Sequence, residues 1–290
     1  MSSKLFNLVF IFAALTAIAF AEESIISKWT GTMSGVGTGT SDATSMVNGP
    51  LIQNVKLTSA TGAEEAVIVA GTADLWNSDF SLNNEVLLAK DLNQGKTGFV
   101  MRLNPTTGAK VWYVTSSTAL GTYFTTLSGI CGGLGSDGVG YVVAYGACTS
   151  AVKACAWKMK ASDGTLITTN GWPRLGSTPS SSIASCSWIP GSDEPVLVAV
   201  QSQVSKVANF TWGGYTMTGT INVKTQDSFI MRGYGTSTSY VVVNAKIVDS
   251  ISLVPGSTTT LMYSGYGLAS SANDATFGKV SLSGSVVSLV

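Results

Sequence analysis

The sequence predicts an all-β protein built as a repeated array of four-stranded antiparallel units, and three observations support this class. A pattern of alternating strand, polar turn and second apolar strand recurs four times between residues 98 and 290. Glycine occurs 32 times in 290 residues and only 11% of residues are charged, which favours strands and turns over long amphipathic helices. Because 45% of residues are hydrophobic, the chain can form a core. A unit this small cannot bury its own apolar face, so its repetition predicts that the copies stack.

Each unit contains four predicted strands. The recurring segment begins with the third strand and lies at residues 98–108, 154–164, 228–238 and 276–284. Second strands, whose continuous apolar runs predict burial on both faces, lie at residues 66–71, 141–146, 195–200 and 260–265. First strands are predicted at residues 51–56, 125–131, 181–186 and 251–254. Fourth strands are predicted at residues 109–114, 165–169, 240–245 and 285–290.

The size of the units is that of a propeller blade. Four antiparallel strands in roughly 45 to 70 residues are typical of one blade of a β-propeller. The predicted blades span approximately residues 51–120, 121–178, 179–248 and 249–290. A β-sandwich made of hairpins is the alternative architecture.

Two connections between second and third strands are much longer than the other two. They run from Gly71 to Arg102 and from Gln201 to Arg232, in the first and third units. Since Phe99 and Phe229 stand 130 residues apart, the chain resembles a duplicated pair of blades. Long loops of this kind often bind ligands.

The recurring segment also resembles a known repeat family. A central strand ending in Gly is followed by a loop, a strand of the pattern Phe-hydrophobic-x-basic-hydrophobic, a Gly turn and a Trp- or Val-rich strand. This pattern is similar to the β-propeller repeats of secreted and cell-surface proteins such as the SBBP-type repeats, over about residues 50–290. It is degenerate: Cys155 replaces the Phe, Thr238 replaces the turn Gly, and the fourth copy is one residue short. The resemblance implies a propeller with an interaction role and supplies no catalytic residues.

The N-terminus has the pattern of a secretory signal peptide over residues 1–21. Lys4 precedes an apolar run that ends at Phe20, and the small residues Ala19 and Ala21 flank an expected cleavage before Glu22. The alternative is a membrane anchor, for which the run is short. We therefore expect a secreted, extracellular chain with no stable membrane span after cleavage.

Residues 22–50 form an N-terminal segment with a possible ring-closing strand. Residues 25–31 resemble a fourth strand, with Trp29 in the place of Trp112. The last unit already has its own fourth strand at residues 285–290, however. Three alternatives stay open: a fifth, incomplete blade, a sequence that stops early, or a strand that pairs elsewhere.

The four cysteines are expected to form two disulfides, as in secreted proteins. Cys148 ends a central strand and Cys155 begins the next, so a bridge across that hairpin fits cross-strand distances. Cys131 and Cys186 stand at equivalent points of adjacent units, where a bridge would join the second unit to the third. The alternative, thiols that are free or bind zinc, lacks the close Cys pairs or His that zinc prefers.

Several function classes are disfavoured by composition. The chain contains no histidine, which excludes Ser-His-Asp and Cys-His nucleophilic sites and His-based metal centres. The 16 basic residues balance the 16 acidic ones and form no basic cluster, so we do not expect the protein to bind nucleic acid. No cofactor or metal is predicted; residues 91–95 match part of a calcium loop, without its bidentate Glu.

Catalysis would therefore need a pair of carboxylates. The best cluster lies in the first long loop and comprises Asp74, Asp79, Glu85 and Asp91. A carbohydrate-active hydrolase or lyase could use two of them, placed about 5–10 Å apart, with the general acid having a raised pKa. Most acidic residues of the chain instead fall in turns, where they favour turn formation.

Aromatic residues in the long loops are the candidate binding residues. They are Trp76, Phe80, Trp212 and Tyr215, whose rings could stack on a sugar or on a partner's apolar side chains. The alternative is that they pack these loops onto the sheets. Trp112, Trp157 and Trp188 fall in predicted strands and are expected in the core. Asn209 begins a sequon for N-glycosylation.

The sequence thus predicts a secreted, disulfide-stabilised, non-catalytic protein that binds a glycan or an extracellular protein partner, in recognition or in cell-surface or matrix adhesion. The first alternative is the carbohydrate-active enzyme described above. The second is a structural repeat module of a larger extracellular assembly.

Overall fold

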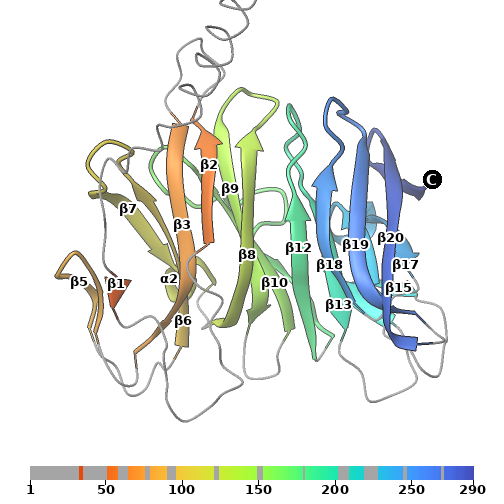
Figure 1. The fold of residues 1–290 in the computed structure, drawn as a ribbon, viewed down its shortest axis with the longest axis horizontal. Coiled ribbons are helices and arrows are strands. Elements are labelled where there is room, and N and C mark those ends of the chain that lie inside the picture. The colour runs from red at the N-terminus through yellow and green to blue at the C-terminus, as the bar shows by residue number, and fades with distance from the viewer. Residues whose placement is uncertain are drawn as a thin grey trace, which may run out of the picture.

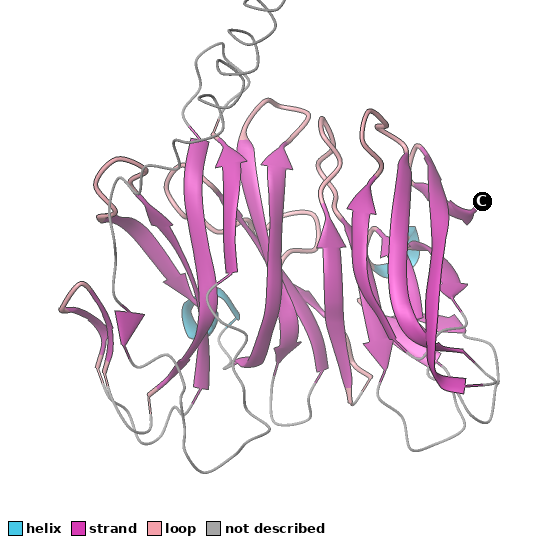
Figure 2. Ribbon diagram, in the orientation of Figure 1, coloured by secondary structure: helices cyan, strands magenta, loops and turns pink. Residues whose placement is uncertain are grey.

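The computed structural model describes residues 33–34, 51–57, 65–75, 79–89, 96–120, 124–148, 153–178, 180–201, 209–218, 228–243, 247–268 and 271–290. These residues form an all-β protein, in which a short α2 (Ser116–Leu120) and a 3-10 turn η1 (Gly235–Ser237) are the only helical elements (Figure 2). No helix of the described residues is both long and apolar enough to cross a membrane. The predicted leader at residues 1–21 and the predicted strand at residues 25–31 lie outside the described residues.

Four four-stranded antiparallel sheets make up most of the molecule, as the sequence predicts. Sheet 1 contains β2 (Leu51–Lys56), β3 (Glu65–Asp74), β6 (Lys96–Leu103) and β7 (Lys110–Thr115). Sheet 2 contains β8 (Phe124–Leu134), β9 (Gly140–Cys148), β10 (Lys153–Lys160) and β11 (Arg174–Leu175). Sheet 3 contains β12 (Ser181–Ser187), β13 (Val196–Gln201), β16 (Ser228–Arg232) and β17 (Ser239–Val243). Sheet 4 contains β18 (Ile247–Leu253), β19 (Thr260–Leu268), β20 (Ser271–Ser283) and β21 (Val286–Leu289).

The four sheets stand side by side in a row, with sheet 1 and sheet 4 at its two ends (Figure 1). Separate hydrophobic clusters join sheet 1 to sheet 2, sheet 2 to sheet 3, and sheet 3 to sheet 4. None of the clusters of described residues joins sheet 4 to sheet 1. We call the side of each sheet toward the preceding sheet its backward face, and the opposite side its forward face.

Central strands are apolar on both sides because each sheet packs against neighbours on both faces. In β13, Val196 and Val198 pack forward against sheet 4, whereas Leu197 and Ala199 pack backward against sheet 2. All four side chains are at most 1% exposed. The continuous apolar runs that identified the second strands in the sequence therefore reflect two buried faces.

The described part of each long connection contains a hairpin. In the first, β4 (Phe80–Leu82) pairs with β5 (Glu85–Leu88), and β4 also pairs with the short β1 (Met33–Ser34). In the second, β14 (Asn209–Trp212) pairs with β15 (Tyr215–Thr218). Each hairpin packs its apolar side on the backward face of its own sheet. The hairpin of sheet 3 consequently lies between sheets 2 and 3, whereas that of sheet 1 covers an end of the array.

The predicted fourth strand at residues 165–169 is wrong. Leu166 makes only an isolated bridge to Met159, and regular pairing with β10 resumes at Arg174 and Leu175. A turn separates the two points of contact, with Asn170 in the left-handed region at φ 54° and a hydrogen bond from Trp172 N to Thr169 O. This detour carries Asn170 outward and helps to form the pocket described below.

The fourth copy of the recurring strand is displaced by one residue relative to its predicted alignment. Phe99 lies opposite Gly71 and Phe229 lies opposite Ala199, but the residue opposite Gly265 is Thr276 rather than Phe277. Because alternate residues of a strand point to opposite faces, Phe277 lies on the forward face of sheet 4 and is 78% exposed.

Both predicted disulfides are confirmed. Cys148 and Cys155 join β9 to β10 within sheet 2, and Cys131 and Cys186 join β8 to β12 between sheets 2 and 3. Their sequence separations are 7 and 55 residues, respectively.

The inter-sheet disulfide should stabilise the protein more than the hairpin disulfide. In the chain-entropy model, closing the longer loop contributes about 4 kcal/mol and closing the shorter about 2.5 kcal/mol. We therefore expect the paired substitution Cys131→Ala with Cys186→Ala to lower the free energy of unfolding by about 1.5 kcal/mol more than Cys148→Ala with Cys155→Ala. Urea unfolding of the two variants measures the difference; equal losses would contradict the expectation.

Candidate binding site

A pocket of about 500 Å³ opens where sheets 2, 3 and 4 meet. Its walls come from the turn before β11, the β12–β13 loop, the turn after β16 and the β20–β21 turn. The lining residues are Asn170, Gly171, Arg174, Glu194, Arg232, Gly233, Tyr234, Ser237 and Ser285.

A glycine shapes the turn after β16 that forms one wall of the pocket. Gly233 has a φ of 94°, and a Cβ at this position would lie 2.6 Å from the carbonyl oxygen of Ser237. A side chain would therefore force the turn apart. The turn is further held by Ser237 Oγ, which donates a hydrogen bond to Tyr234 O at 2.7 Å.

Arg174 is the buried centre of the site. Its side chain is 2% exposed, and its guanidinium lies 4.1 Å from the centre of the Trp172 ring. Arg174 Nη2 donates to Glu194 Oε1 at 2.7 Å, and Nη1 lies 2.6 Å from Glu194 Oε2, a contact of charges rather than a directed hydrogen bond. Nη1 also donates to Gly233 O at 3.3 Å. Arg174 thus ties the end of sheet 2 to two loops of sheet 3.

Arg232 supplies the second guanidinium of the pocket. Its Nη1 donates to Gly284 O of sheet 4, and its Nη2 donates to Ser192 Oγ, which in turn donates to Glu194 O at 3.0 Å. Burial lowers the pKa of Arg232, and the nearby Glu194 opposes this shift. An arginine keeps its charge under such a shift, so the described lining of the pocket contributes two cations and one carboxylate.

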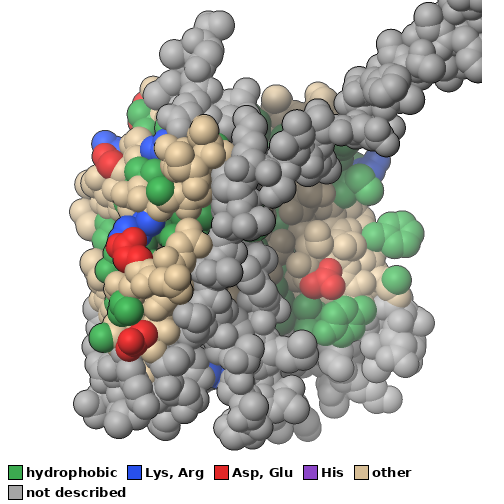
Figure 3. All heavy atoms as spheres, turned by 60° about the vertical axis from the view of Figure 1, so that its left-hand side comes forward, with side chains coloured by type: hydrophobic (Ala, Val, Ile, Leu, Met, Phe, Trp, Pro, Cys, Tyr) green, Lys and Arg blue, Asp and Glu red, His purple; other side chains and the backbone are tan. Residues whose placement is uncertain are grey.

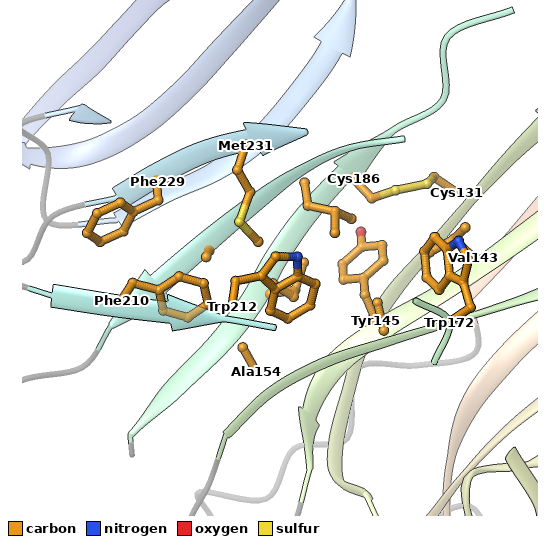
Figure 4. Packing of buried hydrophobic residues seen from close by; sticks show 14 of the residues in the cluster. Cys131, Val143, Tyr145, Ala154, Trp172, Cys186, Phe210, Trp212, Phe229 and Met231 are labelled. Atoms are coloured by element: carbon orange, nitrogen blue, oxygen red, sulfur yellow. A yellow bond between two sulfur atoms is a disulfide. The ribbon is translucent and has the colours of Figure 1, made fainter. Parts of the chain in front are cut away.

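Aromatic side chains support the pocket from behind. Trp212 Nε1 donates to Gly233 O at 3.2 Å, and its ring meets the Tyr234 ring edge-on at a centroid distance of 5.5 Å. Figure 4 shows Trp212 between Phe210 and Tyr145 in the cluster that joins sheets 2 and 3. Tyr234 itself lines the pocket. The indole therefore positions a pocket residue without reaching the pocket surface.

A second group of charged residues fastens sheet 2 to sheet 3 beside the site. Lys158 Nζ donates to Asp193 O at 2.9 Å and lies 3.9 Å from the centre of the Tyr141 ring. Burial lowers the pKa of Lys158, an effect that the charges of Glu194 and Asp193 oppose. Tyr141 donates to Asp137 Oδ2 at 2.7 Å, and burial followed by this hydrogen bond raises the pKa of Tyr141 to about 12. These charged and aromatic groups therefore interact with one another.

The predicted loop aromatics are not gathered into a stacking surface. Phe80 and Trp212 are fully buried at 0% exposure, which contradicts a role for either ring in stacking on a sugar. The alternative weighed from the sequence is the one observed, because both rings pack their hairpins onto the sheets. Tyr215 is half-buried on β15, and Trp76 lies outside the described residues.

The predicted carboxylates lie partly outside the described residues, and those that are described lie on β3 and on or beside the β4–β5 hairpin. Asp79 and Glu85 are exposed, and Glu85 forms an ion pair with Lys110 across to β7. Asp74 ends β3, and Asp91 lies outside the described residues. The end of the molecule that carries sheet 1 shows acidic, basic and hydrophobic side chains interspersed on its described surface (Figure 3). Asn209, the predicted glycosylation site, is a half-buried residue of β14.

The pocket residues were missed in the sequence. Arg232 belongs to the recurring strand pattern, but Arg174 and Glu194 come together only when a turn of sheet 2 meets a loop of sheet 3. No group of three potential metal-ligating side chains occurs in the described part of the chain. Comparison with known proteins adds no assignment, since no protein-family model, curated protein or solved structure matches this chain.

Proposed function

We propose that this protein is a secreted, non-catalytic binding protein that recognises an acidic saccharide in the pocket between sheets 2, 3 and 4. The observation that carries the proposal is the composition of the pocket: among its described lining residues, Arg174 and Arg232 accompany a single carboxylate, Glu194. Since Glu194 is already neutralised by Arg174, the pocket keeps one positive charge for an anionic ligand. Guanidinium groups are well suited to bind carboxylates.

The remaining lining suits a sugar. Asn170, Ser237 and Ser285 provide amide and hydroxyl groups for hydrogen bonds, and Tyr234 provides an aromatic ring. Glycan recognition through connecting loops also agrees with the resemblance to secreted β-propeller repeats, in which the four sheets would be blades. Two disulfides support an extracellular location.

A hydrolase is less well supported by this pocket. Glycosidases of the usual two-carboxylate type need an acid and a second carboxylate about 5–10 Å apart. Glu194 is the one carboxylate among the described residues that line the pocket, and both of its oxygens contact Arg174. We therefore assign binding rather than cleavage to the site.

A charge placed at the pocket rim should discriminate against acidic ligands. Asn170 is exposed, lines the pocket and has a φ of 54°, a conformation that Asp also tolerates. We expect Asn170→Asp to weaken binding of a glucuronate- or sialate-bearing oligosaccharide about tenfold, through like-charge repulsion, and to leave the thermal unfolding temperature unchanged. A glycan array identifies the ligand, and titration calorimetry measures the affinities.

The matched control is Asn84→Asp, since Asn84 is also exposed and left-handed, at φ 69°, in the turn between β4 and β5. It should bind as the unaltered protein does. Equal weakening by both substitutions would mean that net charge alone matters. Failure to bind any acidic saccharide, or binding that Asn170→Asp leaves intact, would contradict this site.

A further inference from the structure

The forward face of sheet 4 is not covered by another sheet of the described residues, and it exposes four large apolar side chains. On this face Met262, Tyr266, Phe277 and Val286 are 45%, 41%, 78% and 53% exposed. The corresponding faces of sheets 1, 2 and 3 are buried against the sheet that follows. An exposed apolar surface of this kind on a stacked sheet indicates an interaction site.

The forward face of sheet 2 shows what packs against such a surface. A β-bulge in the first strand pair fixes the correspondence: Leu127 opposite Gly146 in sheet 2 matches Val248 opposite Gly265 in sheet 4. By this register, Phe277 and Met262 stand where Ala156 and Val143 lie fully buried in the junction of sheets 2 and 3.

A basic residue in the third strand of each sheet shows the same correspondence between the sheets. Arg102 Nη1 donates to Ser162 O of sheet 2, Lys158 to Asp193 O of sheet 3, and Arg232 to Gly284 O of sheet 4. Each of the three thus reaches forward into the next sheet. Lys279 occupies this position in sheet 4 and is exposed.

Sheet 4 also has a free strand edge. β20 pairs with β19 along its length, but β21 pairs only with Val280–Ser283, which leaves residues 271–278 without a strand partner on that side among the described strands. In sheet 2 the matching stretch of β10 pairs with β11, and Gly176 N donates to Ala154 O. Gly176 then bridges to Trp212 of the next hairpin.

The opposite end of the array, at sheet 1, carries the surface that is complementary to sheet 4. β1 pairs Met33 with Leu82, and Leu82 holds the same place in the hairpin of sheet 1 that Trp212 holds in the hairpin of sheet 3. β1 therefore pairs with the hairpin of sheet 1 at the place where Gly176 pairs with the hairpin of sheet 3. Ile52, on the backward face of sheet 1, is 69% exposed.

We propose that two copies of this chain associate head to tail, with the forward face of sheet 4 of one copy covered by sheet 1 and the β4–β5 hairpin of the other. The contact repeats the junction of sheets 2 and 3, and β1 of the second copy completes the free edge of β20. The occupant is a second copy because sheets 1 and 4 of one chain lie at opposite ends of the row (Figure 1). Since the two surfaces differ, the interface is heterologous and closes a ring or extends a chain.

Light scattering coupled to size exclusion tests the proposal with the full secreted chain. We expect an average molecular mass above that of the monomer. This mass should rise as the protein concentration is raised to about 100 μM, the concentration range in which ordinary protein contacts form. We call the forward face of sheet 4 the tail, and sheet 1 with its β4–β5 hairpin the head. Phe277→Asp places a charge on the tail and Ile52→Asp places a charge on the head, so each variant should be monomeric. Both residues are exposed, so circular dichroism and thermal unfolding should be unchanged.

An equimolar mixture of the two variants gives the decisive result. One intact tail and one intact head remain, so the mixture should form dimers and nothing larger. The control Leu289→Asp changes a residue that is 52% exposed on β21 and lies opposite Val280, away from the forward face, and it should associate like the unaltered chain. A monomeric unaltered chain, an Ile52→Asp variant that still associates, or a mixture that stays monomeric would each overturn the proposal.

Discussion

Replacing Trp212 with alanine should lower the free energy of unfolding by about 3–5 kcal/mol, the range for truncating a large buried aromatic side chain. Trp212 is 0% exposed and contacts Phe210 and Tyr234, at ring-centroid distances of 6.0 and 5.5 Å. The substitution also removes the hydrogen bond from Nε1 to Gly233 O. Chemical denaturation of the intact protein, followed by Trp fluorescence and circular dichroism, measures the loss.

Two further variants separate a packing role from a ligand-stacking role. Tyr215→Ala removes the half-buried cross-strand partner of Trp212 and should cost less than Trp212→Ala. Trp212→Phe keeps most of the ring volume, so it should retain the fold and leave saccharide affinity nearly unchanged. If Trp212→Phe abolished binding while unfolding stayed normal, the indole would have to contact the ligand, contrary to its burial.

The strands and the disulfides could be predicted from the sequence because both depend on local pattern. Alternating and continuous apolar runs mark one-sided and two-sided burial, as for Val196 and Leu197 in β13. Trp157 and Trp188, expected in the core, are 1% and 7% exposed. Cys148 and Cys155 flank a single hairpin, and Cys131 and Cys186 occupy matching first strands.

The site could not be predicted because it depends on contacts between units. Phe80 and Trp212 lie in long connections, and only the pairing of those connections into hairpins shows that their rings turn inward. Arg174 had no predicted role, since its partner Glu194 belongs to a loop of the next sheet. The sequence pattern places Phe277 one residue away from its register in the structure, and that single step moves the side chain from a buried face to an exposed one.

Removing the Arg174 guanidinium should be among the most destabilising charge changes in the described part of the protein. The side chain of Arg174 is 2% exposed and that of Glu194 is 27% exposed, so Arg174→Met leaves a largely buried carboxylate without its donor. It also removes one of the two donors to the Gly233 carbonyl, which keeps its hydrogen bond from Trp212 Nε1. Breaking a buried ion pair costs about 3–5 kcal/mol. Because Glu194 keeps some contact with water, we expect a loss near the lower end, about 3 kcal/mol, measured by urea unfolding.

The exposed pair of Lys110 and Glu85 provides the comparison for this ion pair. Glu85 is 58% exposed on its side chain, so Lys110→Met should cost less than about 1 kcal/mol. The double variant Arg174→Met with Glu194→Gln removes both charges and should recover part of the loss, with a coupling energy that a double-mutant cycle reports. If Arg174→Met were as mild as Lys110→Met yet abolished saccharide binding, Arg174 would be a ligand-binding residue. A large loss of stability that the double variant partly reverses would instead assign Arg174 to positioning the loops, and would leave Arg232 as the cation that meets the ligand.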